Sequence, residues 1–150
     1  MPSYDVSAHS TASPSAVYAV IVDVPRWADW QLVTSISPES PPAGPDDLVG
    51  TVWVLRDRFT TTRVRITELV PEHRLSYAAL SEPVSRDYRA TIDLAPGESG
   101  GTDIRWHATF RPRLPGTGRL LEWFLRPYMA KVVGRLAHRA RTSADQQGHG

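Results

Sequence analysis

A period of two dominates five successive segments between residues 50 and 110, and it constrains the fold more than any other feature. The segments are GTVWVL (50–55), TRVRITEL (62–69), RLSYAAL (74–80), RDYRATIDL (86–94) and TDIRWHATF (102–110). Such alternation predicts strands with one covered face and one face in water. Turn signals such as VPEH and PGESGG separate most of the strands closely enough for antiparallel pairing.

The part of the chain before these strands predicts one strand, two short helices and one weaker strand. SYDVSAHS (3–10) alternates and predicts the first strand. Ser13 followed by Pro14 is typical of a helix start, and Pro25 ends that helix. The sequence that follows, RWADW, predicts a second short helix, and a weak strand is expected around 32–37. The proline-rich segment 38–47 predicts a loop.

A long amphipathic helix is predicted after the last strand, over residues 117–142, with a kink or irregular turn near Pro127. The order of elements is therefore strand, two short helices, six strands and a long helix, which predicts an α+β protein. A curved antiparallel sheet has one face to cover, and the terminal helix is the only element large enough to do so.

The parity of the alternation predicts which strand residues are covered. The residues expected on the covered face are Val52, Val54, Val64, Ile66, Tyr77, Tyr88, Ala90, Ile92, Ile104, Trp106, Ala108 and Phe110. Arg89, Arg105 and His107 are expected to face water.

Length and composition limit the function classes. The 150 residues fit one domain, predicted as 1–142 with a flexible tail at 143–150. The absence of cysteine excludes a disulfide framework and a thiol nucleophile, and the net charge of +1 gives no reason to expect nucleic acid as a partner. Histidines at metal-ligand spacing, a GxSxG elbow and phosphate-binding glycine motifs are absent, so we expect no metal and no cofactor. Without a signal sequence or a membrane-length apolar run, the expected location is the cytoplasm.

Several motifs together resemble the START-like superfamily, also called SRPBCC or the polyketide cyclase/dehydrase and lipid-transport group. They are SAHSTASPSAVYAVIVDVPRWADW (7–30), VGTVWV (49–54), ITELVPEHRLSY (66–77) and PGTGRLLEWF (115–124). The resemblance extends over about residues 4 to 140. It implies a helix-grip fold, in which a curved antiparallel sheet of six to seven strands wraps around the C-terminal helix. It also implies a cavity between helix and sheet, with the two short helices near its mouth.

This resemblance, combined with parity, predicts a ligand-binding cavity. Its expected lining is Trp30, Val54, Tyr77, Tyr88, Ala90, Trp106, Ala108, Phe124 and Tyr128. Trp30 is placed near the mouth, and the two alanines leave room beside the aromatic rings. The alternative for Trp30 and its neighbour Trp27 is that both wedge the short helices against the sheet. The tyrosines, equally, are either ligand contacts or space-filling side chains.

Three functions follow from this interpretation. The protein binds a small apolar ligand, such as a lipid or polyketide; or it is a polyketide aromatase/cyclase or dehydrase that uses general acid–base chemistry; or its core is filled and it has no cavity. No catalytic residue is identified. The basic outer side of the terminal helix is explained either by the helix dipole or by contact with an acidic partner or a membrane surface. A monomer and a homodimer both remain open.

Overall fold

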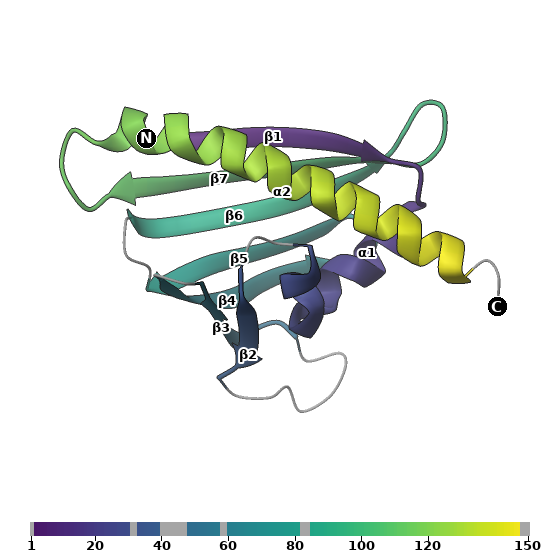
Figure 1. Cartoon of the computed structure of the whole chain (residues 1–150), viewed down its shortest axis with the longest axis horizontal. Helices are drawn as coiled ribbons and strands as arrows, with labels where there is room; N and C mark the ends of the chain where they lie inside the picture. The colour runs from purple at the N-terminus through teal and green to yellow at the C-terminus, as the bar shows by residue number, and fades with distance from the viewer. Residues whose placement is uncertain (1, 31–32, 40–47, 58–59, 82–84, 148–150) are drawn as a thin grey trace.

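Seven strands form one antiparallel sheet in the computed structural model, which describes residues 2–30, 33–39, 48–57, 60–81 and 85–147. The strands are β1 (Ser3–Ser10), β2 (Ser35–Pro38), β3 (Val52–Arg56), β4 (Thr61–Val70), β5 (Arg74–Ser81), β6 (Ser85–Pro96) and β7 (Thr102–Pro112). Their order in the sheet is β1-β7-β6-β5-β4-β3-β2, and every neighbouring pair is antiparallel (Figure 1). The predicted strands are confirmed. Most of the proline-rich loop lies outside the described residues.

Two short helices follow β1, as predicted. Helix α1 (Pro14–Val22) begins at Ser13, whose Oγ accepts a hydrogen bond from the Ala16 backbone N at 3.2 Å. This bond satisfies one of the free N–H groups of the first turn, and Pro14 has no N–H that needs a partner there. The 3-10 helix η1 (Val24–Asp29) comes next, with Trp30 as its C-terminal cap residue.

The C-terminal helix α2 (Gly118–Gln147) packs mainly against β1 and α1 and less extensively against β7. In Figure 1 it crosses the sheet diagonally. The buried side of its second half consists of Met129, Val132, Val133, Leu136, Ala137 and Ala140. The helix continues five residues beyond the predicted end, and residues 148–150 of the predicted tail lie outside the described part. Pro127 lies inside the helix, where it cannot donate a backbone hydrogen bond to the preceding turn.

The parity prediction is confirmed for β6 and β7. Ile92, Trp106 and Phe110 are fully buried, whereas Arg89 and Arg105 are exposed. In each of these two strands, the large apolar residues occupy alternate positions, so the alternation alone determines which face is covered.

In β3 the parity prediction is wrong. Trp53 and Leu55 are buried, while Val52 and Val54 are only partly buried and lie on the other face. Val54 is therefore not part of the interior. Four consecutive apolar residues leave the parity of this strand undetermined. The register decides it: Trp53 is paired with the buried Val64.

Register irregularities accompany the curvature of the sheet. The pairing of β4 with β5 shifts at two places, and the pairing of β6 with β7 shifts between Arg86 and Arg89. Asp87, within the irregularity between β6 and β7, has a φ of 54°, a left-handed conformation that aspartate tolerates better than most residues. Such bulges increase the local twist and bend the strand. The bent sheet then presents a concave face to the helices.

Candidate functional site

Seven aromatic side chains form a cluster on the concave face of the sheet. They are Tyr4, Trp27, Trp30, Tyr77, Tyr88, Trp106 and Phe110. Their neighbouring ring centroids lie 5.9–6.3 Å apart, and most of the ring pairs are tilted or edge-on. Separations and angles of this kind stabilise aromatic pairs beyond the burial of their area. Strands β1, β5, β6 and β7 supply five of the rings, and the segment of η1 supplies the two tryptophans.

The two tryptophans of the η1 segment differ in how their polar atoms are satisfied. Trp27 is fully buried, and its Nε1 donates a hydrogen bond to the Ile21 carbonyl at 2.9 Å. This bond ties η1 to α1, so Trp27 has a structural role. Trp30 is 2% exposed, and its ring lies 5.9 Å from that of Trp106.

Three tyrosine side chains bring hydroxyl groups into the cluster. The hydroxyls of Tyr4 and Tyr88 are hydrogen-bonded to each other, and the Tyr77 ring lies 6.2 Å from that of Tyr88. Burial raises the pKa of Tyr4 and of Tyr88 well above the usual value. Burial also raises the pKa of Tyr77 to about 12, although the Tyr88 hydroxyl partly offsets the effect. All three hydroxyls are therefore neutral near pH 7.

Two buried indole N–H groups in the cluster lack hydrogen-bond partners. Nε1 of Trp30 and Nε1 of Trp106 have no acceptor at hydrogen-bond geometry within the described part of the protein. The Trp106 indole nevertheless lies close enough to the Tyr4 and Tyr77 hydroxyls to oppose the rise in pKa of both. A buried donor without an acceptor costs about 1–3 kcal/mol. Such unsatisfied groups are uncommon in folded proteins, and these two belong to adjacent rings. Two adjacent donors of this kind can bind an oxygen acceptor.

In the described part of the chain, the interior offers hydrogen-bond donors but no ionised acid or base. Among the described residues, the buried polar side chains are Ser10, Thr51 and Thr102. His107 is partly buried on the outer face, and the other described histidines are exposed. Tyrosines with raised pKa values can donate hydrogen bonds at neutral pH, but they cannot act there as general bases. This chemistry suits binding of carbonyl or hydroxyl oxygens better than proton abstraction.

The structure brings together six of the nine residues predicted to line a cavity. They are Trp30, Tyr77, Tyr88, Ala90, Trp106 and Ala108. Ala90 and Ala108 are register partners in β6 and β7, and each is at most 3% exposed. That these six residues bind a ligand stays a prediction. Tyr4 is not among the residues predicted to line the cavity, although its alternation with Val6 places both on one face of the first strand.

The remaining predicted positions are Tyr128, at the edge of this region, and Phe124 and Val54 outside it. Tyr128 is partly buried, and burial raises the pKa of its hydroxyl, with a smaller contribution from the Asp57 carboxylate. The Phe124 ring stacks on it with centroids 6.5 Å apart, yet Phe124 is 61% exposed. The prediction that Phe124 faces the interior is therefore wrong. Five residues separate it from the buried Met129, which rotates it by about 140° around the helix.

A groove of about 540 Å³ runs along the outside of the cluster between η1 and α2. Its lining is Asp29, Trp30, Lys131, Gly134, Arg135, His138, Arg139 and Thr142. Arg135 Nε donates to the Trp30 carbonyl at 2.7 Å, and Arg139 Nη2 lies 3.3 Å from Asp29 Oδ2. Trp30 therefore belongs both to the groove and, through Trp106, to the aromatic interior.

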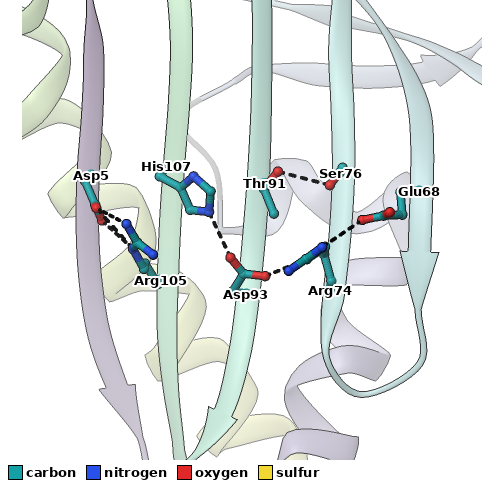
Figure 2. A network of polar contacts seen from close by, with 8 residues as sticks. All are labelled: Asp5, Glu68, Arg74, Ser76, Thr91, Asp93, Arg105 and His107. Carbon is teal, nitrogen blue, oxygen red and sulfur yellow. Dashed lines mark hydrogen bonds and ion pairs between the residues drawn. The ribbon is translucent and has the colours of Figure 1, made fainter.

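A second polar arrangement lies on the outer face of the sheet, remote from the cluster. Figure 2 shows Glu68, Arg74, Asp93 and His107 in a line across β4, β5, β6 and β7. Arg74 Nε is 2.7 Å from Asp93 Oδ1, and His107 Nε2 is 2.8 Å from Asp93 Oδ2 (Figure 2). Partial burial opposes ionisation of Asp93, but the bonds from His107 and Arg74 outweigh it and lower the pKa of this carboxyl. This row of contacts crosses four strands and ties them to one another, so we assign it a structural role.

The described residues form neither a metal-binding group nor a membrane-spanning helix. In that part of the chain, no three His, Cys, Asp or Glu side chains are grouped closely enough to hold a metal ion. None of the described helices combines the length and the apolar character that a membrane crossing requires.

The bent sheet, the long terminal helix across it and the two short helices after β1 define the START-like helix-grip class of proteins. The sequence pattern of one family within this class, described as polyketide cyclase / dehydrase and lipid transport, matches residues 1–141. The chain belongs to this family. Among curated proteins, none matches the sequence.

Solved structures share the fold at low sequence identity. A START superfamily protein from Mycobacterium smegmatis has a TM-score of 0.81 at 9% identity, over 95% of this chain and 99% of that one. A protein from Thermobifida fusca has a TM-score of 0.78 at 22% identity, covering 93% of each chain. Zhui aromatase/cyclase from Streptomyces sp. R1128 has a TM-score of 0.76 at 16% identity, covering 92% of each chain. At these identities the similarity establishes the architecture alone.

Proposed function

We propose that this protein binds a small, largely apolar molecule that carries carbonyl or hydroxyl oxygens, and that it binds it within the aromatic cluster. One observation carries the proposal: among the described residues, the buried Nε1 atoms of Trp30 and Trp106 have no acceptor at hydrogen-bond geometry. A ligand oxygen between them would satisfy both donors and remove the cost of leaving them unpaired. The aromatic rings would supply most of the affinity through burial of apolar area, and the hydroxyl groups would orient the ligand.

The ligand enters, in this proposal, past Trp30. This residue lines the groove and contacts Trp106 in the interior, so a shift of its ring toward the groove opens the cluster. Ala90 and Ala108 are the small residues on the covered face of the central strands. Because their side chains occupy little volume, the neighbouring aromatic rings need to move less to admit a ligand.

A matched pair of ligands tests the role of the unpaired donors. Fluorene and 9-fluorenone share a ring skeleton, but only the ketone carries an acceptor. We expect 9-fluorenone to bind roughly three- to tenfold more tightly, because one net hydrogen bond contributes about 0.5–1.5 kcal/mol. Equilibrium dialysis, with the bound ligand quantified by absorbance, measures this ratio.

The Trp106→Phe variant should lower that ratio, because it keeps an aromatic ring and removes one of the two donors. Trp53→Phe is the matched control, since the Trp53 Nε1 donates to Thr51 Oγ1 at 2.9 Å, away from the cluster. An unchanged ratio in Trp106→Phe, or no binding of either compound to the parent, would exclude the proposal. Native mass spectrometry of the purified protein would identify the chemical class of any natural ligand.

A second candidate, polyketide cyclase or dehydrase activity, is favoured by the converging hydroxyls of Tyr4, Tyr77 and Tyr88. Neutral phenols can hold the oxygen of a ketone as negative charge develops on it. For such an enzyme, Tyr88→Phe should abolish conversion of a poly-β-ketone while its binding persists. If the protein only binds the compound, parent and variant will both return it unchanged, as chromatography of the incubated compound would reveal.

A further inference from the structure

The first half of α2 exposes a stripe of large apolar side chains. Leu120 is 63% exposed, Trp123 76% and Phe124 61%, and the nearby Leu114 is 70% exposed. Spacings of three and four residues place Leu120, Trp123 and Phe124 on one side of the helix. That side lies roughly opposite Met129, whose face is buried against the rest of the protein. These three helical residues are called the apolar stripe below.

The exposure of the apolar stripe has no counterpart elsewhere among the described residues. The other large apolar side chains that are exposed, Val49, Val70 and Leu80, are 51%, 38% and 39% exposed and lie in separate segments. Isolated exposed apolar residues are normal, whereas a contiguous group on one helix face marks an interaction surface.

Cations border the apolar stripe. Arg119, Trp123, Arg126 and Pro127 line a hollow of about 470 Å³ together with Glu122. Glu122 is engaged toward β1, because its Oε1 accepts a hydrogen bond from the Ser3 backbone N at 2.9 Å. The two arginines thus flank the most exposed ring of the stripe. Lys131, on the same outer side one turn beyond Pro127, extends the positive border.

Charge distinguishes among the partners that would cover this surface. A second copy of the chain docked symmetrically would place Arg119 and Arg126 against the same residues of its partner, which like-charge repulsion disfavours. A bilayer that contains anionic phospholipid matches all the features: tryptophan, phenylalanine and leucine insert at the level of the head groups, and arginines bind lipid phosphates. We infer that the apolar stripe and its flanking arginines dock the protein on the surface of an anionic phospholipid bilayer.

Co-sedimentation with lipid vesicles tests the inference on the full-length protein. At low salt, we expect binding to vesicles of phosphatidylcholine with one-third phosphatidylglycerol at least tenfold stronger than to phosphatidylcholine alone. Trp123→Ser should weaken this binding at least tenfold, since it removes the most exposed ring of the stripe. Leu80→Ser, an apolar-to-polar change at an exposed site in β5, should leave binding unchanged.

A charge-matched pair of variants tests the cations. Arg119→Gln combined with Arg126→Gln should weaken binding to the anionic vesicles severalfold and reduce its dependence on salt. The control, Arg65→Gln combined with Arg89→Gln, removes the same number of positive charges from the outer face of the sheet. It should have little effect on binding to the vesicles. Thermal melting verifies that all four variants are folded. Absence of binding to anionic vesicles, equal losses in both arginine pairs, or a dimer in sedimentation equilibrium that Trp123→Ser dissociates would overturn the inference.

Discussion

At the scale of single residues, the aromatic interior combines apolar rings with hydroxyls that must remain protonated. Tyr77 shows this most clearly, because burial raises its pKa to about 12. In the unfolded chain a tyrosine ionises near pH 10. The folded state therefore holds its proton over a range in which the unfolded state has lost it, and stability falls as pH rises through this range.

We predict that the free energy of unfolding declines between about pH 10 and 12, with Tyr77 alone accounting for roughly 2–3 kcal/mol. Below pH 10 the contribution is fully present. Tyr77→Phe should make the decline shallower, whereas Tyr18→Phe, which removes a partly buried hydroxyl on α1, should change it much less. Urea denaturation at stepped pH measures the slopes. Equal slopes in the parent and Tyr77→Phe would contradict the burial of this hydroxyl.

At the scale of elements, the outer face of the sheet is held together by side-chain contacts that cross strands. Asp93 of β6 is the central member, since it pairs with Arg74 of β5 and with His107 of β7. The pKa of Asp93 is lower in the folded protein than the usual aspartate pKa of about 3.9. The ionised carboxylate therefore stabilises the folded state above that pH, and this stabilisation is lost as the pH falls through the pKa of the folded state.

Asp93→Asn is expected to reduce the free energy of unfolding by about 1 kcal/mol at pH 7, since Arg74 and His107 both lose the carboxylate to which they are hydrogen-bonded. The difference from the parent should shrink as pH falls below about 4. Asp103→Asn removes a more exposed carboxylate that pairs with His9, and it should cost less than about 0.5 kcal/mol. Chemical denaturation at pH 7 and pH 3 measures both. A larger loss in Asp103→Asn would contradict this account.

At the scale of the whole molecule, the two ends of the described chain are joined. Strand β1 pairs with β7 and packs under α2. Ser10 completes the junction: its Oγ donates to the Ala137 carbonyl at 2.8 Å and accepts from the Ala12 backbone N. Close by, the buried Thr102 Oγ1 donates to the Ala12 carbonyl.

Ser10→Ala should lower the free energy of unfolding by about 1–2 kcal/mol, because it leaves the buried Ala12 N–H without its acceptor. Hydrogen exchange should accelerate both at Ala12 and in α2 around Ala137, whose carbonyl the same hydroxyl contacts. Ser7→Ala, at an exposed position of the same strand, should change stability by less than about 0.5 kcal/mol. Faster exchange confined to β1 would argue against a coupling of the two ends.

The sequence pattern predicted the sheet, the short helices and the long terminal helix, because most strands carry apolar residues of one parity and the helix start has a capping serine and a proline. It failed at β3, where Val52 to Leu55 are all apolar and parity is undefined. It failed again at Phe124, because apolar residues surround the first turns of α2 and do not select a face.

Much of the candidate site could not be predicted. Parity placed Tyr77, Tyr88 and Trp106 on the covered face, since that information lies within each strand. The hydrogen bond between the Tyr4 and Tyr88 hydroxyls, and the contact of Trp30 with Trp106, depend on how distant segments are set against one another. The absence of acceptors for two indole N–H groups depends on every neighbouring atom, and no periodicity carries that information.

The pairing of β1 with β7 has a consequence for the order in which the protein is made. Ser3 is opposite Thr109, so the first strand leaves the ribosome long before its partner exists. At about 5–20 residues per second, the delay is on the order of 5–20 s. Throughout this time Tyr4 and Val6 have neither β7 nor α2 to cover them. One side of the first strand, which carries Tyr4 and Val6, therefore stays uncovered until β7 and α2 have been synthesised.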